Sequence, residues 1–294
     1  MKILLLVLSC LAAPATAHET ASFLNVGVGA RALALGGAYT AVAEDANAIY
    51  WNPAGLAGVV KREFTVSHAE LTQGSRHDFA AYAQTFKSAT IAGSLTYLSH
   101  QDVDGRDALG HKSGGYRAAD AAAGAAWATR TGFADFGVGV KFVHSHIGSA
   151  EAQTAAVDAG ARRALGPVLI GAAVRGLGPG LKYDAQTNDL PLRLALGGAY
   201  MIAGGHLIAA ELTNGPRGAG TDVGIGGEYQ AVTDFFFRAG YTTISAVADG
   251  AGFEAARGLT LGLGFLTARW KIDYATVPMG ELGCTHRFTF GARW

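Results

Sequence analysis

The sequence predicts an all-β fold, a transmembrane antiparallel β-barrel of about 14 strands with an N-terminal hatch, or plug, inside the lumen. Three observations predict it. From Arg62 onward, apolar residues alternate with small or polar ones at a period of two, which indicates strands with one apolar face. Short and long connections alternate along the chain, and the final strand candidate ends in Trp294. We divide the chain into a signal peptide (1–17), the hatch (18–61) and the barrel (62–294).

The first 17 residues have the order of a secretory signal peptide. Met1-Lys2 is followed by the apolar run Ile3 to Leu8 and by the small-residue exit Ala15-Thr16-Ala17. Cys10 leaves lipidation open, although the apolar run ahead of it is short for a lipoprotein signal. Removing this segment leaves Cys284 as the only cysteine, so we expect no intramolecular disulfide.

Composition favours a protein in contact with lipid. Hydrophobic residues make up 50% of the chain and charged residues 16%, whereas soluble domains carry about 25% charged residues. No run of 18 apolar residues follows the signal peptide, so we expect no spanning helix. With 23 basic and 23 acidic residues, no charge excess favours a nucleic-acid partner.

The segment 18–61 does not alternate and reads as a compact plug. A helix-compatible stretch runs from about Thr40 to Trp51, and Asn52 ends it because a residue before proline avoids the helical region. Gly36 and Gly37 permit positive φ or close backbone approach. A barrel this wide cannot be filled by its own side chains, so we expect residues 18–61 to occupy the lumen.

The strands are clearest where large apolar residues share one face. Phe136, Val138, Val140 and Phe142 oppose Gly137, Gly139 and Lys141, and the same split recurs further along the chain. A soluble β-sandwich would alternate too. The turn signals divide residues 62–294 into about fourteen strands, with about 17 residues per strand and loop, which fits strands tilted across a bilayer.

Connections expected to be tight are Phe86 to Ala89, Thr131 to Ala134, Leu165 to Val168, Ala203 to His206, Gln230 to Asp234 and Thr267 to Arg269. Those expected to be long are His100 to Arg117, Gly176 to Asp189, Asn214 to Thr221, Thr242 to Gly258 and Pro278 to Cys284. This alternation is typical of barrels with one periplasmic and one external rim.

Ionisable residues fall on the small or polar face and are expected to face the lumen: Lys141, Arg175, Arg193, Glu211, Glu228, Arg238, Lys271, Asp273, Arg287 and Arg293. An arginine facing lipid near the midplane costs about 2–4 kcal/mol. A wet or hatch-filled lumen would tolerate and pair these charges. A sharper alternative makes the arginines part of a path for an anionic solute such as a carboxylate head group.

The last residues form an amphipathic strand. Phe288, Phe290 and Trp294 share one face, and this aromatic ending resembles the sorting signal that the barrel-assembly machinery reads in Gram-negative outer-membrane proteins. An ordinary edge strand is the alternative. Because unpaired edges are a liability, we expect the last strand to close the barrel against the first.

The segment GARALALGGAYTAVAEDANAIYWNPAGLAG (29–58) resembles the N-terminal signature of PorV/PorQ-like outer-membrane proteins, within the FadL-like family of fourteen-stranded barrels with an N-terminal hatch. In FadL-like transporters an Asn-Pro-Ala element belongs to the hatch, whose movement is tied to passage of hydrophobic ligand. The resemblance places the hatch and ligand path on these residues: Gly36, Gly37, Tyr50, Trp51, Asn52, Pro53, Ala54 and Gly55.

The resemblance implies passage of small hydrophobic or amphipathic molecules across a Gram-negative outer membrane. Its alternative is a PorV-like, non-enzymatic anchor or shuttle of type IX secretion, and a non-selective pore is a third class. The implied partners are outer-membrane lipid, the barrel-assembly machinery, and hydrophobic small molecules or secreted proteins.

Motifs for catalysis or cofactor binding are weak. Gly27-Val28-Gly29 lacks the third glycine and the strand–helix context of a nucleotide site. His144 and His146 share a strand face, but two ligands rarely suffice for a metal. G-x-S-x-G is absent. We therefore expect neither an enzyme nor a bound metal or cofactor.

Overall fold

The computed structural model describes residues 19–101, 103–106, 109–183, 186–217, 219–243, 258–278 and 283–294. The signal peptide expected at 1–17, with Cys10, lies outside these residues, and so do parts of the long connections. No helix within the described ranges is long and apolar enough to cross a membrane.

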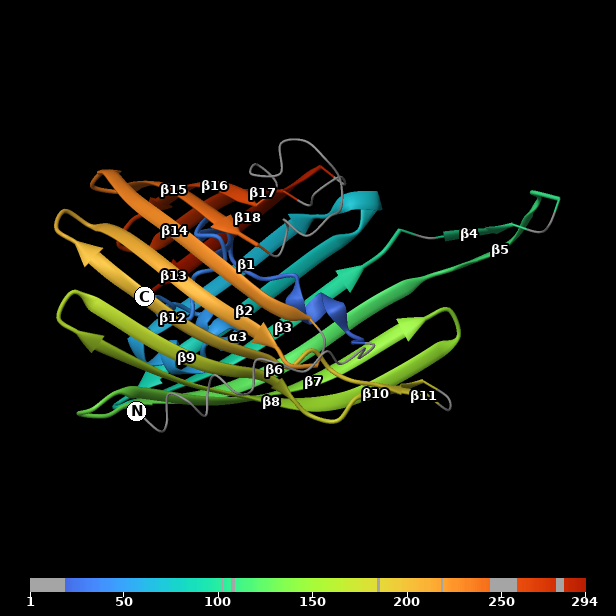
Figure 1. The fold of residues 1–294 in the computed structure, drawn as a ribbon, viewed down its shortest axis with the longest axis horizontal. Helices are drawn as coiled ribbons and strands as arrows, with labels where there is room; N and C mark the ends of the chain where they lie inside the picture. Colours follow the sequence, from blue (N-terminus) through green and yellow to red (C-terminus); the bar gives the residue numbers. More distant parts are fainter. Residues whose placement is uncertain are drawn as a thin grey trace.

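Antiparallel strands form one closed barrel, in the order β1-β18-β17-β16-β15-β14-β13-β12-β9-β8-β7-β6-β3-β2 (Figure 1). The predicted fourteen-stranded fold is confirmed. The strands are β1 (Arg62–Glu70), β2 (Arg76–Phe86), β3 (Ala89–Ser99), β6 (Ala118–Arg130), β7 (Asp135–Ile147), β8 (Ala150–Leu165), β9 (Val168–Leu177), β12 (Arg193–Ile202), β13 (His206–Gly215), β14 (Gly220–Val232), β15 (Phe235–Thr242), β16 (Leu259–Leu266), β17 (Trp270–Pro278) and β18 (Cys284–Arg293).

The last strand closes the barrel against the first. β18 pairs with β1 from Glu63 opposite Arg293 to Glu70 opposite His286, so both strands gain a partner on each side. The tight connections and the long ones lie at opposite ends of the strands. We call these ends the tight-turn rim and the long-loop rim.

Two of the long connections contain additional hairpins that the sequence analysis treated as loops. β4 (Val103–Arg106) pairs with β5 (Lys112–Tyr116), and β10 (Leu181–Tyr183) pairs with β11 (Gln186–Asn188). Figure 1 shows the β4–β5 hairpin projecting well beyond the barrel wall. These strands are short and polar or glycine-rich, so the period-two signal that revealed the wall strands is weak in them.

The outer face of the wall is largely apolar. Val138 and Val140 are 50% and 59% exposed on β7, and comparable valine, leucine, isoleucine and phenylalanine side chains lie on most other wall strands. Near the tight-turn rim, Trp270 packs on Phe290 and Tyr82 lies near Trp294, with ring centroids 5.5 and 6.4 Å apart. An apolar band with aromatic residues at its edge is the surface that a bilayer covers.

The segment before β1 runs through the lumen. It contains η2 (Ser22–Asn25), α2 (Ala30–Ala34), α3 (Ala48–Trp51) and η3 (Pro53–Gly58), seen in blue within the barrel in Figure 1. At the long-loop rim the Thr20 amide donates to the Asp189 carbonyl at 2.9 Å. At the tight-turn rim the Thr85 hydroxyl donates to the Val59 carbonyl at 2.7 Å. We call residues 19–29 the strap and residues 30–58 the hatch core.

The helix expected from about Thr40 to Trp51 is shorter in the structure, and α2 was not expected. The amides of Tyr39 and Thr40 donate to the Glu211 carboxylate of β13, at 2.8 and 2.7 Å, and the amide of Asn47 donates to the Asp45 carboxylate at 3.1 Å. These carboxylates capture amides that would otherwise continue a helix. The predicted end at Trp51 is confirmed, since Asn52 is extended at φ −158°.

Candidate functional site: a cavity between the hatch and the barrel wall

The hatch core contacts the wall backbone to backbone at glycines. A Cβ atom at Gly226 of β14 would lie 2.5 Å from the Leu35 carbonyl oxygen, and one at Gly240 of β15 would overlap the Gly36 amide. On another arc of the wall, a Cβ at Gly137 of β7 would overlap Pro53. Glycine in a strand permits such close backbone approach. The hatch core therefore fits its wall without an intervening layer of side chains.

Gly36 and Gly37 have different reasons to be glycine. Both have positive φ, 67° and 80°, where a side chain is strained. At Gly36 a Cβ would also collide with the carbonyl oxygens of Ile225 and Tyr241, whereas at Gly37 its nearest neighbour would be Trp51, at 3.9 Å. Both glycines thus have the positive φ that the sequence suggested, and Gly36 also makes the close backbone approach.

A buried ion network fixes α2 to β14, β15 and β17. The Arg31 guanidinium donates twice to Glu228, through Nε and Nη2, each at 2.9 Å. Arg238 also donates to Glu228, at 2.6 Å, and to Asp273, at 2.7 Å. Glu228, Arg238 and Asp273 are almost fully buried. Charge-assisted bonds of this kind are strong and directional, so they fix the orientation of α2.

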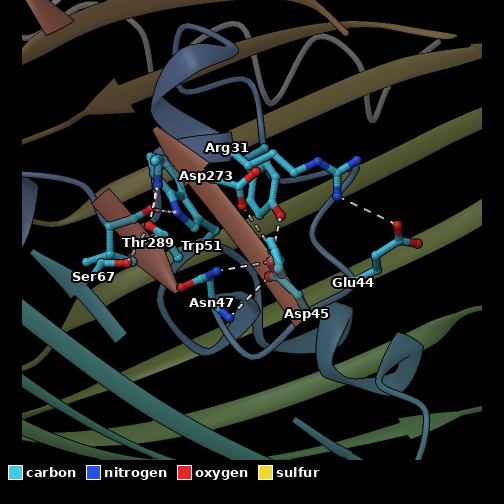
Figure 2. A network of polar contacts seen from close by, with 12 residues as sticks. Arg31, Glu44, Asp45, Asn47, Trp51, Ser67, Asp273 and Thr289 are labelled. Carbon is cyan, nitrogen blue, oxygen red and sulfur yellow. Dashed lines mark hydrogen bonds and ion pairs between the residues drawn. The ribbon is translucent and has the colours of Figure 1, made fainter. Parts of the chain in front are cut away.

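Asp45 joins the middle of the hatch core to the same side of the wall. Its carboxylate pairs with the Lys271 ammonium of β17 and accepts hydrogen bonds from the Tyr39 hydroxyl, at 3.1 Å, and the Asn47 amide group, at 3.0 Å. Figure 2 shows Asp45 beside Asn47. Burial opposes the charged form, but Lys271 outweighs it and holds the pKa of Asp45 below its ordinary value.

Asn52 links three parts of the chain through its side chain. Its amide nitrogen donates to the Thr40 carbonyl at 2.8 Å and to the Ala161 carbonyl of β8 at 3.2 Å, and its oxygen accepts from the Ala54 amide at 3.1 Å. Every polar atom of the side chain is used in a fully buried position. In this conformation the Asn-Pro-Ala element connects the hatch core to the wall.

A cavity of about 370 Å³ lies between the strap, the hatch core and the ends of the wall strands toward the long-loop rim. Its apolar surface comes from Leu24, Val26, Leu33, Tyr50, Trp51 and Leu71, and its charged surface from Lys141, Arg175, Arg193, Glu211, Asp222 and Arg287. The volume is at the lower end of the range for small-molecule sites, about 300–1,000 Å³. One small ligand is the matching occupant.

The strap covers this cavity and is held by a few polar contacts. The Tyr50 hydroxyl accepts from the Gly27 amide at 3.1 Å and donates to the Leu24 carbonyl at 2.7 Å. Arg287 donates to the Val26 and Gly27 carbonyls, at 3.2 and 3.3 Å. Burial raises the pKa of Tyr50 above its ordinary value, so the hydroxyl keeps the proton that it donates.

The structure separates the sequence-predicted residues into three groups. Those that line the cavity are Gly36, Gly37, Tyr50, Trp51, Lys141, Arg175, Arg193, Glu211 and Arg287. Those buried between the hatch core and the wall, away from the cavity lining, are Asn52, Pro53, Ala54, Gly55, Glu228, Arg238 and Asp273, and Lys271 is half-buried there. The aromatic residues Phe288 and Phe290 of β18, and Trp294 just after it, are about half exposed on the outside.

Arg31 and Asp222 are site residues that sequence reasoning missed. The only sequence signal for Arg31 is its place in a run of small residues, and its partner Glu228 lies 197 positions away.

Among the described residues, the histidines considered as metal ligands do not form a metal site. His146 lies 3.3 Å from Glu151. Across the described part of the chain, no group of three or more His, Cys, Asp or Glu residues is placed to hold a metal.

Comparison with solved structures finds the same barrel fold in two toluene transporters. The toluene transporter TbuX of Ralstonia pickettii matches with a TM-score of 0.66 and 15% identity, over 91% of this chain and 98% of its own. The toluene transporter TodX of P. putida matches with a TM-score of 0.65 and 12% identity, over 91% and 99%. No protein-family model and no curated protein matches. At these identities the likeness establishes the fold, that of an outer-membrane β-barrel.

Proposed function

We propose that this protein conducts small hydrophobic or amphipathic molecules across the outer membrane, without catalysing a reaction. The observation that carries the proposal is the cavity, whose walls are largely apolar and which lies between the strap and the hatch core. TbuX and TodX, which share the fold, are toluene transporters. A ligand would enter from the long-loop rim, occupy the cavity, and leave when the hatch region rearranges, because a close-packed plug leaves no continuous path.

Filling the cavity tests this proposal. Leu33 projects from α2 into the cavity, so Leu33→Trp should reduce binding and passage. Leu196→Trp is the matched control, since Leu196 is 51% exposed on the lipid-facing surface and a larger apolar group is tolerated there. The assay is entry of radiolabelled toluene into cells that carry each variant in the outer membrane. Equal entry with the wild-type barrel, the Leu33 variant and no barrel would refute the proposal.

The second proposal is a PorV-like anchor or shuttle for type IX secretion. It is favoured by the sequence signature at residues 29–58 and by the tight docking of the hatch core, which suits a sealed barrel. Cross-linking in native membranes would then recover secreted proteins attached to the long-loop rim, and Leu33→Trp would leave secretion unchanged. Steady conductance of the unmodified barrel in planar bilayers would instead indicate a non-selective pore.

A further inference from the structure

Two arginines that face the cavity have no acidic partner, unlike the other two cations there. Lys141 pairs with Asp158 at 2.7 Å, and Arg193 pairs with Glu19 at 2.8 Å. Within the described residues, Arg175 and Arg287 form no ion pair, and the Nε atom of each is buried with no hydrogen-bond partner. Arg287 is buried and Arg175 is half-buried. A cation withdrawn from water without an anion in contact is unfavourable, so both side chains can accept an anion from a ligand.

The contacts of these arginines leave donors free. Arg287 uses one terminal nitrogen, Nη1, on backbone carbonyls of the strap. Arg175 stacks near aromatic rings, with its guanidinium carbon 5.8 Å from the Tyr50 centroid and 5.3 Å from that of Trp51. A guanidinium held in this way can still present its planar fork to a carboxylate.

The acidic residues of the cavity make no ion-pair contact with these arginines, although Glu211 attracts Arg175 electrostatically. The Glu211 carboxylate accepts the amides of Tyr39 and Thr40, and Asp222 lies on β14. Neither forms an ion pair with Arg175 or Arg287 among the described contacts. A ligand carboxylate would therefore add hydrogen bonds to donors that are unused, without displacing an existing ion pair.

The rest of the cavity suits a flat ring. Tyr50 and Trp51 form an edge-to-face pair, with centroids 5.1 Å apart at 72°, and Leu24 and Leu33 line the same space. Lining residues come from strands spread around the barrel, including β7, β9, β13 and β18. The cavity thus extends across the lumen, and the rings of Tyr50 and Trp51 beside Arg175 give it an aromatic wall on which a planar ligand can pack.

We propose that the cavity binds small aromatic carboxylates, with the carboxylate at Arg287 and Arg175 and the ring against Tyr50 and Trp51. This inference rests on the proposed function and names the ligand class of the same site. A site of this kind requires a negative charge on the ligand, which neutral hydrocarbons lack. It also requires an aromatic ring, which alkyl carboxylates lack.

Calorimetry on the full chain in lipid nanodiscs tests the proposal with three probes: benzoate, its neutral analogue benzamide, and the alkyl carboxylate octanoate. Benzoate should bind at least about tenfold more tightly than benzamide, because a charge-assisted hydrogen bond supplies at least that factor. It should also bind more tightly than octanoate, which carries the same charge but has no ring to pack on Tyr50 and Trp51. Arg287→Gln and Arg175→Gln should each weaken benzoate about tenfold or more and leave benzamide unchanged. The control is Arg130→Gln at the tight-turn rim, outside the cavity lining, where Arg130 is 59% exposed, and it should change benzoate affinity less than about twofold.

The outcomes separate the inference from the function on which it rests. Equal affinity for benzoate and benzamide would overturn the role of the arginines, and tighter binding of octanoate would overturn the aromatic assignment. In both cases barrel-dependent toluene entry would still support passage. Should Arg287→Gln fail to assemble, judged by heat-modifiable migration on gels, Arg175→Gln decides, because Arg175 makes no hydrogen bond to the strap. Absence of benzoate binding together with barrel-independent toluene entry would refute both proposals.

Discussion

Arg31 is the hatch residue whose replacement should loosen the hatch core most directly. In Arg31→Met the stem keeps its apolar packing, while both hydrogen bonds to Glu228 are lost. Each charge-assisted bond contributes about 1.5–3 kcal/mol. Removing one partner of a buried pair costs about 3–5 kcal/mol when the remaining charge is left alone. Because Arg238 still pairs with Glu228 at 2.6 Å, we expect the lower end, about 3 kcal/mol.

A loss of that size would raise the population of undocked hatch by about 100-fold. Hydrogen exchange in nanodiscs, read by mass spectrometry, measures it as faster exchange of amides in residues 30–58, whereas the wall strands keep their protection because their hydrogen bonds are independent of the hatch. The matched control is Arg130→Met, which breaks the Arg130–Asp135 pair at the tight-turn rim, where Arg130 is 59% exposed. Exposed pairs contribute about 0–1 kcal/mol, so hatch exchange should stay unchanged.

The reasoning is wrong if hatch exchange in Arg31→Met stays within about threefold of wild type, a change below 1 kcal/mol. Glycine docking alone would then hold the hatch core. It is also wrong if the wall strands lose protection to the same degree, since hatch and wall would then open as one unit.

Three further predictions test individual contacts. Gly36→Ala should undock the hatch core, whereas Gly37→Ala should lower the stability of the docked hatch core by only about 1–2 kcal/mol. Positive φ is common to both sites, but the collision with Ile225 and Tyr241 occurs only at Gly36. Hydrogen exchange of residues 30–58 measures the difference, and equal effects would contradict the prediction. Tyr50→Phe removes the hydroxyl that contacts Leu24 and Gly27. It should raise the hydrogen exchange rate of strap residues 20–27 by a factor corresponding to about 1–3 kcal/mol and leave residues 30–58 protected. Faster exchange over the whole hatch would show that the strap does not move separately. Asn52→Asp should destabilise the hatch core because it replaces the amide donor to Thr40 and Ala161 with an acceptor. The control is Asn214→Asp, whose hydrogen bonds to Gly220 and Thr221 are solvent-exposed, and equal thermal unfolding of the two variants would refute this prediction.

The barrel could be predicted because its signal is local and repeated. In each wall strand, alternate residues meet lipid and the lumen, so residues such as Val138 and Val140 carry the pattern without reference to any distant residue. Turn signals then indicated the strand count, and the need to pair terminal edges indicated the closing pair. The short hairpins β4–β5 and β10–β11 were missed because they face no lipid and alternate weakly.

The location of the hatch could be predicted from the sequence, but its internal structure could not. Proline marked the end of α3, and Gly36-Gly37 marked the unusual backbone. The start of the helix could not be found, because the amides of Tyr39 and Thr40 are captured by Glu211, a wall residue that lies 172 and 171 positions away. The same holds for Arg31 and Glu228. Partners at such separations leave no periodic signal, so inward charges could be predicted as a class while their pairing could not.

The distribution of contacts decides which part of the N-terminal segment can open the cavity at least cost. The hatch core docks at glycines on two separate arcs of the wall, at Gly137 on β7 and at Gly226 and Gly240 on β14 and β15. A shift away from one arc drives the backbone into the other, and the ion pairs of Arg31 and Asp45 would break as well. The strap has no such docking, although its ends are held by the Glu19–Arg193 ion pair and by the hydrogen bond from Trp51 to Val28. Between these ends, residues 24–27 are held by hydrogen bonds to Tyr50 and Arg287, each contributing about 0.5–1.5 kcal/mol, or somewhat more for the charged donor. Displacement of residues 24–27 is therefore a less costly route into the cavity than undocking of the hatch core, and the Asn-Pro-Ala element remains in place while it occurs.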